Sequence, residues 1–240
     1  MIKVVRAVSL WVLLVAMIGF AGQTSWTADR FEVSGIKAVR PTIVNTIAAL
    51  KKGDVAKARA SFADYDSAWN GIEVYINTRD KAMYDDLEHH WQAKIEEGLK
   101  APKPDTTSLL SDAQMMLGKY DEAIAMVEKA APLNPVYDDV ARLRIARANL
   151  REVTPELKAG EVAKARKSFA AFEAKLPSVS GLIKSRSQVT YDRIQEGLPE
   201  IKTALMAEKP DMDHTVALVN GVMEKYNSVV TDLTKEARSR

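Results

Sequence analysis

The stretch "LKKGDVAKARASF" at residues 50–62 returns almost unchanged as "LKAGEVAKARKSF" at residues 157–169. Ten of the thirteen positions are identical, and the two stretches start 107 residues apart. Glycine is the residue that most often ends a helix, and an acidic residue directly after it can cap the next one. Gly53 followed by Asp54 therefore predicts a turn between two helices, and Gly160 predicts the same turn in the second stretch. The lysines and arginines of the motif are expected on the solvated face.

The correspondence continues well beyond the motif. Tyr84 matches Tyr191 at the offset of 107, and "KPD" at residues 103–105 matches residues 209–211 at an offset of 106. Repeat units of solenoid proteins span only about 20–50 residues. The longer period predicts two copies of one small domain.

Within each copy, apolar residues recur at alternating spacings of three and four, which is the pattern of a helix with one buried stripe. In the first copy they are Val55, Ala58, Phe62, Tyr65, Trp69, Ile72 and Ile76, and in the second Val162, Ala165, Phe169, Phe172, Leu176, Val179 and Ile183. Further stripes follow before and after the Lys-Pro-Asp break. Short turns between four such helices predict an antiparallel four-helix bundle in each copy.

The predicted fold is therefore all-α, with two tandem antiparallel four-helix bundles produced by an internal duplication. The first bundle is assigned to residues 34–131 and the second to residues 137–237, with the boundary in "PLNPV" at residues 132–136. Proline inside a helix removes a hydrogen bond and bends the helix. Kinks are expected at the prolines inside predicted helices of the second copy, which are Pro155, Pro177 and Pro199.

The chain begins with a short basic segment followed by an apolar run. Lys3 and Arg6 precede the uncharged residues 7–20, a run that is shorter than the ~20 residues of a membrane span. Small residues at Gly19 and Ala21 fit a cleavage site. Residues 1–21 are therefore predicted to be a signal peptide, and the mature protein is expected in the periplasm. The alternative is an uncleaved anchor that holds the protein at the inner membrane, facing the periplasm.

Charge and composition exclude several classes of function. Removal of Lys3 and Arg6 with the signal peptide leaves 32 basic against 32 acidic residues. With no basic block and no nucleic-acid-binding motif, nucleic acid is rejected as a partner. The absence of cysteine excludes disulfides and thiolate chemistry. No catalytic motif is recognisable, so the protein is not expected to be an enzyme.

Differences between the copies point to a candidate metal site in the first. Glu73 and Glu88 have Ser180 and Gln195 as counterparts. At 100° per residue, each glutamate flanks its apolar stripe, and their heights along the predicted hairpin differ by roughly 5 Å. Two carboxylates at one level of a bundle can bind a cation, and Tyr84 can add an oxygen ligand. The competing interpretation is two surface glutamates paired with lysines.

The histidines in "LEHHW" at residues 87–91 add less. Successive helical residues point about 100° apart, so His89 and His90 cannot chelate one ion together. His90 lies on the flank of the stripe and is kept as a further candidate ligand, whereas His89 is expected to be exposed.

Two patterns carry a family resemblance. Trp-x-x-Ile-Glu at residues 69–73, followed by Tyr-x-x-Leu-Glu at residues 84–88, resembles the helical extracytoplasmic domains attached to bacterial iron permeases. The paired four-helix bundles are similar to the imelysin family of exported proteins, which is linked to iron acquisition. The resemblance implies Glu73 and Glu88 as metal ligands, each framed by the aromatic residue that opens its pattern. The chain departs from imelysins in lacking their His-x-x-Glu signature, and from the permeases in lacking their membrane portion.

Two functions follow as expectations. The first is an exported, non-enzymatic binding or accessory protein linked to uptake of iron or another divalent or trivalent cation, with a membrane transporter or another periplasmic protein as partner. The second is a periplasmic helical module that binds a partner protein and takes no metal or small molecule. Direct contact with the membrane is expected only if the first segment stays uncleaved.

Overall fold

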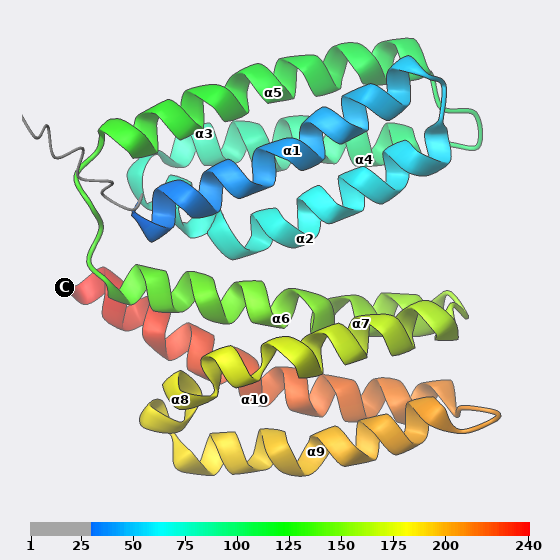
Figure 1. Cartoon of the computed structure of the whole chain (residues 1–240), viewed down its shortest axis with the longest axis vertical. Coiled ribbons are helices and arrows are strands. Elements are labelled where there is room, and N and C mark those ends of the chain that lie inside the picture. Colours follow the sequence, from blue (N-terminus) through cyan, green and yellow to red (C-terminus); the bar gives the residue numbers. More distant parts are fainter. Residues whose placement is uncertain (1–29) are drawn as a thin grey trace, which may run out of the picture.

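The computed structural model describes residues 30–240, and every regular element in that range is a helix (Figure 1). The prediction of an all-α protein is confirmed. The predicted signal peptide, residues 1–21, lies outside the described residues. Among residues 30–240, no helix combines the length and the apolar character that crossing a membrane requires.

The helices form two groups, drawn above and below one another in Figure 1. In the first group, one helical run from residue 81 to residue 100 contains a π-helical segment, η1, between α3 and α4. The elements of this group are α1 (Phe31–Lys51), α2 (Val55–Arg79), α3 (Lys81–Asp85), η1 (Asp86–Gln92), α4 (Ala93–Lys100) and α5 (Thr106–Lys129).

The second group follows after residues 130–135, which contain no helix and include most of the expected boundary. Its elements are α6 (Val136–Lys158), α7 (Val162–Lys175), α8 (Pro177–Arg186), α9 (Gln188–Met206) and α10 (Met212–Ser239). Pro177 starts α8, so the chain breaks there into two helices where we expected a kink in one. Pro155 and Pro199 lie inside continuous helices.

The turns of the repeated motif are built as the sequence predicts. Gly53 and Gly160 have positive φ angles of 67° and 75°, a conformation that costs side-chain-bearing residues energy. Asp54 caps α2 by accepting a hydrogen bond from the Lys57 N–H at 3.0 Å. Glu161 makes no such cap on α7. Glycine is therefore the shared requirement of both turns.

The arginines of the motif do more than face solvent. Arg59 Nε donates to the carbonyl of Leu99 at 2.6 Å, and Arg166 Nε donates to the carbonyl of Leu205 at 2.7 Å. Each guanidinium thus binds the last turn of the third helical run of its group, where carbonyls have no partner within the helix. The expectation of purely solvated arginines was incomplete.

The helices of each group also share a buried tyrosine contact. The Tyr120 hydroxyl on α5 donates to the Ile36 carbonyl on α1 at 2.8 Å. The Tyr226 hydroxyl on α10 donates to the Leu143 carbonyl on α6 at 2.9 Å. Both tyrosines are fully buried, and the hydrogen bond satisfies the one polar atom that each carries into the core.

The two groups meet where α2 packs against α6. A Cβ atom added to Gly71 would lie 2.4 Å from Ile145 Cγ1 and 3.3 Å from the backbone of the same residue. No side chain fits between the two helices at this point. Gly71 therefore sets how closely the first group approaches the second.

Gly71→Ala should lower the free energy of unfolding by about 1–3 kcal/mol, because the new methyl group must push Ile145 and α6 away. The matched control is Gly118→Ala on α5, where an added Cβ meets nothing within 4 Å. That change should stabilise the protein by ~0.5–1 kcal/mol, through helix propensity alone. Urea unfolding followed by circular dichroism measures both. Stabilisation by Gly71→Ala would contradict the close approach.

Candidate functional site

The predicted ligand Glu73 lies on α2 and faces α6 of the other group. Its side chain is 16% exposed, and Arg144 Nη1 donates to Glu73 Oε1 at 2.8 Å. Burial raises the pKa of Glu73 to about 7, with Arg144 opposing the rise and the charge of Glu88 adding to it. Glu73 is neither solvated nor paired with a lysine, unlike the glutamate of the competing interpretation.

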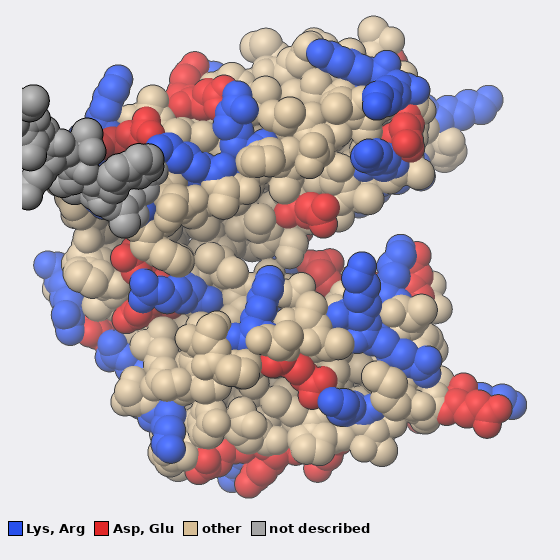
Figure 2. Space-filling view, in the orientation of Figure 1, with Lys and Arg blue, Asp and Glu red and all other residues tan. Residues whose placement is uncertain are grey.

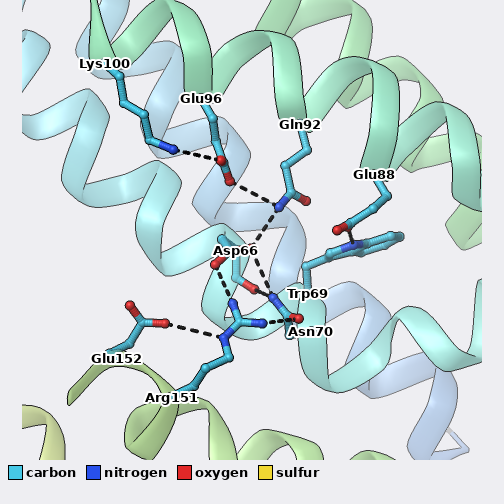
Figure 3. A network of polar contacts seen from close by, with 9 residues as sticks. All are labelled: Asp66, Trp69, Asn70, Glu88, Gln92, Glu96, Lys100, Arg151 and Glu152. Atoms are coloured by element: carbon cyan, nitrogen blue, oxygen red, sulfur yellow. Dashed lines mark hydrogen bonds and ion pairs between the residues drawn. The ribbon is translucent and has the colours of Figure 1, made fainter. Parts of the chain in front are cut away.

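Glu88 lies on η1 and is held by an aromatic side chain of α2. The indole N–H of Trp69 donates to Glu88 Oε2, as Figure 3 shows. Burial raises the pKa of Glu88, and the hydrogen bond from Trp69 lowers it. Tyr84 stacks on Trp69 with ring centroids 6.3 Å apart. Burial and the charges of Glu73 and Glu88 raise the pKa of Tyr84 to about 12, so the phenol stays protonated at neutral pH.

The two histidines of η1 are exposed. The His89 side chain is 67% exposed and lies 3.8 Å from Asp85, as a surface pair on one helix. The His90 ring packs edge-on against Trp91, with centroids 4.6 Å apart. Within residues 30–240, no group of three or more His, Asp or Glu side chains is placed to hold a metal ion. A site formed by Glu73 and Glu88 is a smaller set, and it stays a prediction.

The π-helical segment explains why the sequence offset changes from 107 to 106. Leu87 and Ile95 are both fully buried and are eight residues apart, whereas Ile194 and Ile201 on α9 are also fully buried and seven apart. In an α-helix of ~3.6 residues per turn, seven residues return to within about 20° of the starting face, and eight overshoot it by about 80°. The wider turn of η1 absorbs the extra residue and keeps both core positions inward.

The extra residue brings polar atoms into the interior. Trp91 and Gln92 occupy the place that Leu198 fills alone in α9. Gln92 is 4% exposed. The Trp91 Nε1 and Gln92 Oε1 atoms are buried without a hydrogen-bond partner. Such atoms are costly unless something binds them, and π-helical turns occur often at functional sites.

Gln92 belongs to a polar network that joins three elements (Figure 3). Its Nε2 atom donates to Asp66 Oδ1 on α2 at 2.8 Å. Arg151 on α6 donates to Asp66 Oδ2 at 2.7 Å and also to Asn70. Asp66 thus accepts hydrogen bonds from both groups. Sequence reasoning missed this residue, because a single Asp on a helix flank gives no signal of its partners.

A pocket of about 440 Å³ lies beside this network, between α2, α4 and α6. Its lining includes Phe62, Leu99 and Pro155 together with the carboxylates of Asp66, Glu96 and Glu152. Figure 2 shows the molecule hollowed between the two groups, with basic and acidic side chains intermingled on the face in view. Small-molecule sites commonly have this size and this mixture of apolar and polar walls.

Comparison with known proteins found no match to the chain among family models, curated proteins or solved structures.

The raised pKa of Glu73 predicts a pH-dependent stability. The folded protein holds a proton on Glu73 between its ordinary pKa of 4.5 and the folded value of about 7, whereas the unfolded chain does not. The contribution of Glu73 to the free energy of unfolding should therefore fall by roughly 3 kcal/mol as the pH rises through this window, and stay level above it. Urea unfolding at several pH values should give a flatter profile for Glu73→Gln. An unchanged profile would contradict the assignment.

The extra residue of η1 predicts the effect of a deletion. Removing His89 leaves Leu87 and Ile95 seven residues apart, so the run should become a regular α-helix and the protein should stay folded. The matched control removes Glu196 from α9, which has no extra residue to lose. That deletion should rotate the core positions after it off the buried face and unfold the second group. Circular dichroism and thermal unfolding of the two variants test the difference, and equal damage from both deletions would argue against it.

Proposed function

We propose that the protein is an exported, non-enzymatic binding or accessory protein that takes a metal cation at Glu73 and Glu88. The observation that carries the proposal is the placement of Glu73, whose side chain is only 16% exposed, near enough to Glu88 for the charge of Glu88 to add to a rise of the Glu73 pKa to about 7 that burial causes and Arg144 opposes. A carboxyl that holds a proton because of burial and a neighbouring negative charge gains from exchanging that proton for a cation. Iron or another divalent or trivalent cation is the expected ligand.

A cation that binds Glu73 and Glu88 must displace the hydrogen-bond donors that these glutamates already have. It competes with Arg144 for Glu73 and with the indole N–H of Trp69 for Glu88. The Tyr84 phenol lies against Trp69 and is available as an additional oxygen ligand. Because Arg144 repels a cation, we expect binding to be weak and to strengthen as the pH rises above 7. His90 is kept as a candidate only if the exposed end of η1 rearranges.

We also propose that the two groups of helices are four-helix bundles descended from one duplicated domain, spanning residues 34–131 and 137–237. The matching contacts support this, because they lie at corresponding places in both halves. They comprise the Arg59 and Arg166 contacts to the ends of α4 and α9 and the Tyr120 and Tyr226 contacts to α1 and α6.

The proposed location is the periplasm, with cleavage after Ala21, and the proposed partner is a membrane transporter or another periplasmic protein. The basis is the sequence of the first 21 residues, with its basic start and short apolar run. Amino-terminal sequencing of the protein recovered from a periplasmic extract tests the location. A protein that keeps Met1 and stays with the membrane fraction would favour the anchored alternative.

The cation site is tested by titrating the mature protein with Fe²⁺, Fe³⁺, Cu²⁺ and Zn²⁺ in a calorimeter. The Glu73→Ala/Glu88→Ala variant should lose at least ~10-fold in affinity, since it removes both charged ligands. The matched control is Ser180→Ala/Gln195→Ala, which alters the corresponding positions of the second group and should bind like the unmodified protein. Far-UV circular dichroism checks that each variant is folded.

The same titration separates the two expected functions. Equal binding by the wild type and the Glu73→Ala/Glu88→Ala variant, or no binding by either, would reject the cation site. The protein-interaction module would then be the better description. Within residues 30–240, four large apolar side chains are exposed and could contact a partner protein. They lie on three different helices and are Val44, Met115, Val189 and Met206.

A further inference from the structure

The pocket between α2, α4 and α6 has carboxylates on opposite walls. Glu96 comes from α4 and Glu152 from α6, and Figure 3 shows them on different ribbons, with Asp66 and Arg151 near them. Phe62 also lines the pocket and supplies apolar surface. The lining therefore offers a carboxylate on each of two walls and an apolar surface, and it also includes the cations Arg59 and Lys100.

The positive charges near the pocket are mostly engaged elsewhere. Arg59 gives Nε to the Leu99 carbonyl at 2.6 Å and Nη2 to the Ala101 carbonyl at 3.3 Å. Arg151 binds Asp66 at 2.7 Å and Asn70, so its charge is matched by Asp66. Arg59 is therefore engaged by backbone carbonyls, and Arg151 divides its one charge between Asp66 and the more distant Glu152.

The wall carboxylates themselves are held loosely. Glu96 pairs with Lys100 at 3.2 Å, and that lysine is 77% exposed, so water screens the pair. Glu152 lies 3.8 Å from Arg151 Nε, which is too long for a strong hydrogen bond. Burial raises the pKa of Glu152, with Arg151 opposing the rise and the charges of Asp66 and Glu156 adding to it. A cationic group placed next to Glu96 or Glu152 would therefore interact favourably with the carboxylate.

The unpartnered atoms nearby are also acceptors. Glu156 is next to the lining residue Pro155, and its Oε2 atom is buried without a hydrogen-bond partner. Gln92 bonds to both Asp66 and Glu96 through Nε2, and its Oε1 atom is likewise unpartnered. Neither Gln92 nor Glu156 lines the pocket, so the preference for a ligand with N–H donors over an anion comes from the lining carboxylates of Asp66, Glu96 and Glu152.

We propose that this pocket binds an alkyl diammonium compound, with one ammonium group at Glu96, the other at Glu152, and the alkyl chain against Phe62 and Leu99. The volume of about 440 Å³ accommodates a short linear diamine. A single metal ion suits the pocket less well, because its carboxylates stand on separate walls. The site is distinct from Glu73 and Glu88, so it goes beyond the cation binding proposed above.

Calorimetric titration of the full protein with 1,4-diaminobutane tests the proposal at low ionic strength. The diamine should bind at least ~10-fold more tightly than 1-aminobutane, because the second ammonium finds its own carboxylate. Butane-1,4-diol, with the same chain and no charge, should not bind. Glu96→Gln and Glu152→Gln should each reduce the diamine affinity at least ~10-fold, while keeping the size of the side chain.

The matched control is Glu173→Gln on α7, the counterpart of Asp66 in the second group, which should leave diamine binding unchanged. The Glu73→Ala/Glu88→Ala variant should also keep it, so failure of the cation site and failure of this pocket are distinguishable. Thermal unfolding confirms that each variant is folded. The proposal is overturned if 1,4-diaminobutane gives no binding at 10 mM, if 1-aminobutane binds equally well, or if the two glutamine variants bind like the wild type.

Discussion

The packing of α2 on α6 is the contact that joins the two groups of helices. Gly71 lets the two helices approach closely, and the charged side chains beside it are partly buried between them. A carboxylate in that position is costly unless a cation meets it, and the pairs Glu73–Arg144 and Asp66–Arg151 meet this requirement across the contact. Glu73 and Asp66 are therefore placed by the same contact that joins the two groups of helices, whereas Glu88 is held within the first group by Trp69.

The helices could be predicted from the sequence because their signals are local. Apolar spacing, a glycine at each turn of the repeated motif and the Lys-Pro-Asp breaks mark the helices and their ends, and the described helices follow them closely. Long-range partners gave no such signal. From the sequence, Arg59 was expected to be one more exposed cation of the motif. It binds the end of a helix about forty residues later in the chain. Pro177 was recognised as a disturbance, but the sequence did not reveal that it separates two helices.

The candidate site could be located by comparing the two repeats, since Glu73 and Glu88 stand out where the second copy carries uncharged residues. Their partners could not be found in that way, because Arg144 comes from the other group of helices. The change of offset between the two copies, from 107 to 106, was visible in the sequence. Treating residues 81–100 as one regular α-helix hid the fact that this run contains one extra residue. A buried leucine and isoleucine eight residues apart would have been the clue to η1, and hence to the inward position of Gln92.

The π-helical turn has a consequence for how such a chain can change over time. Since the core positions before and after η1 keep their places, loss of a single residue here is expected to change which side chains face the interior and to leave the remaining helices in place. A regular α-helix offers no such freedom for the loss of a residue, because it has no extra residue to give up and the shortened chain rotates everything that follows. Mutations in this segment can therefore change the polar side chains inside the first group of helices without changing the fold.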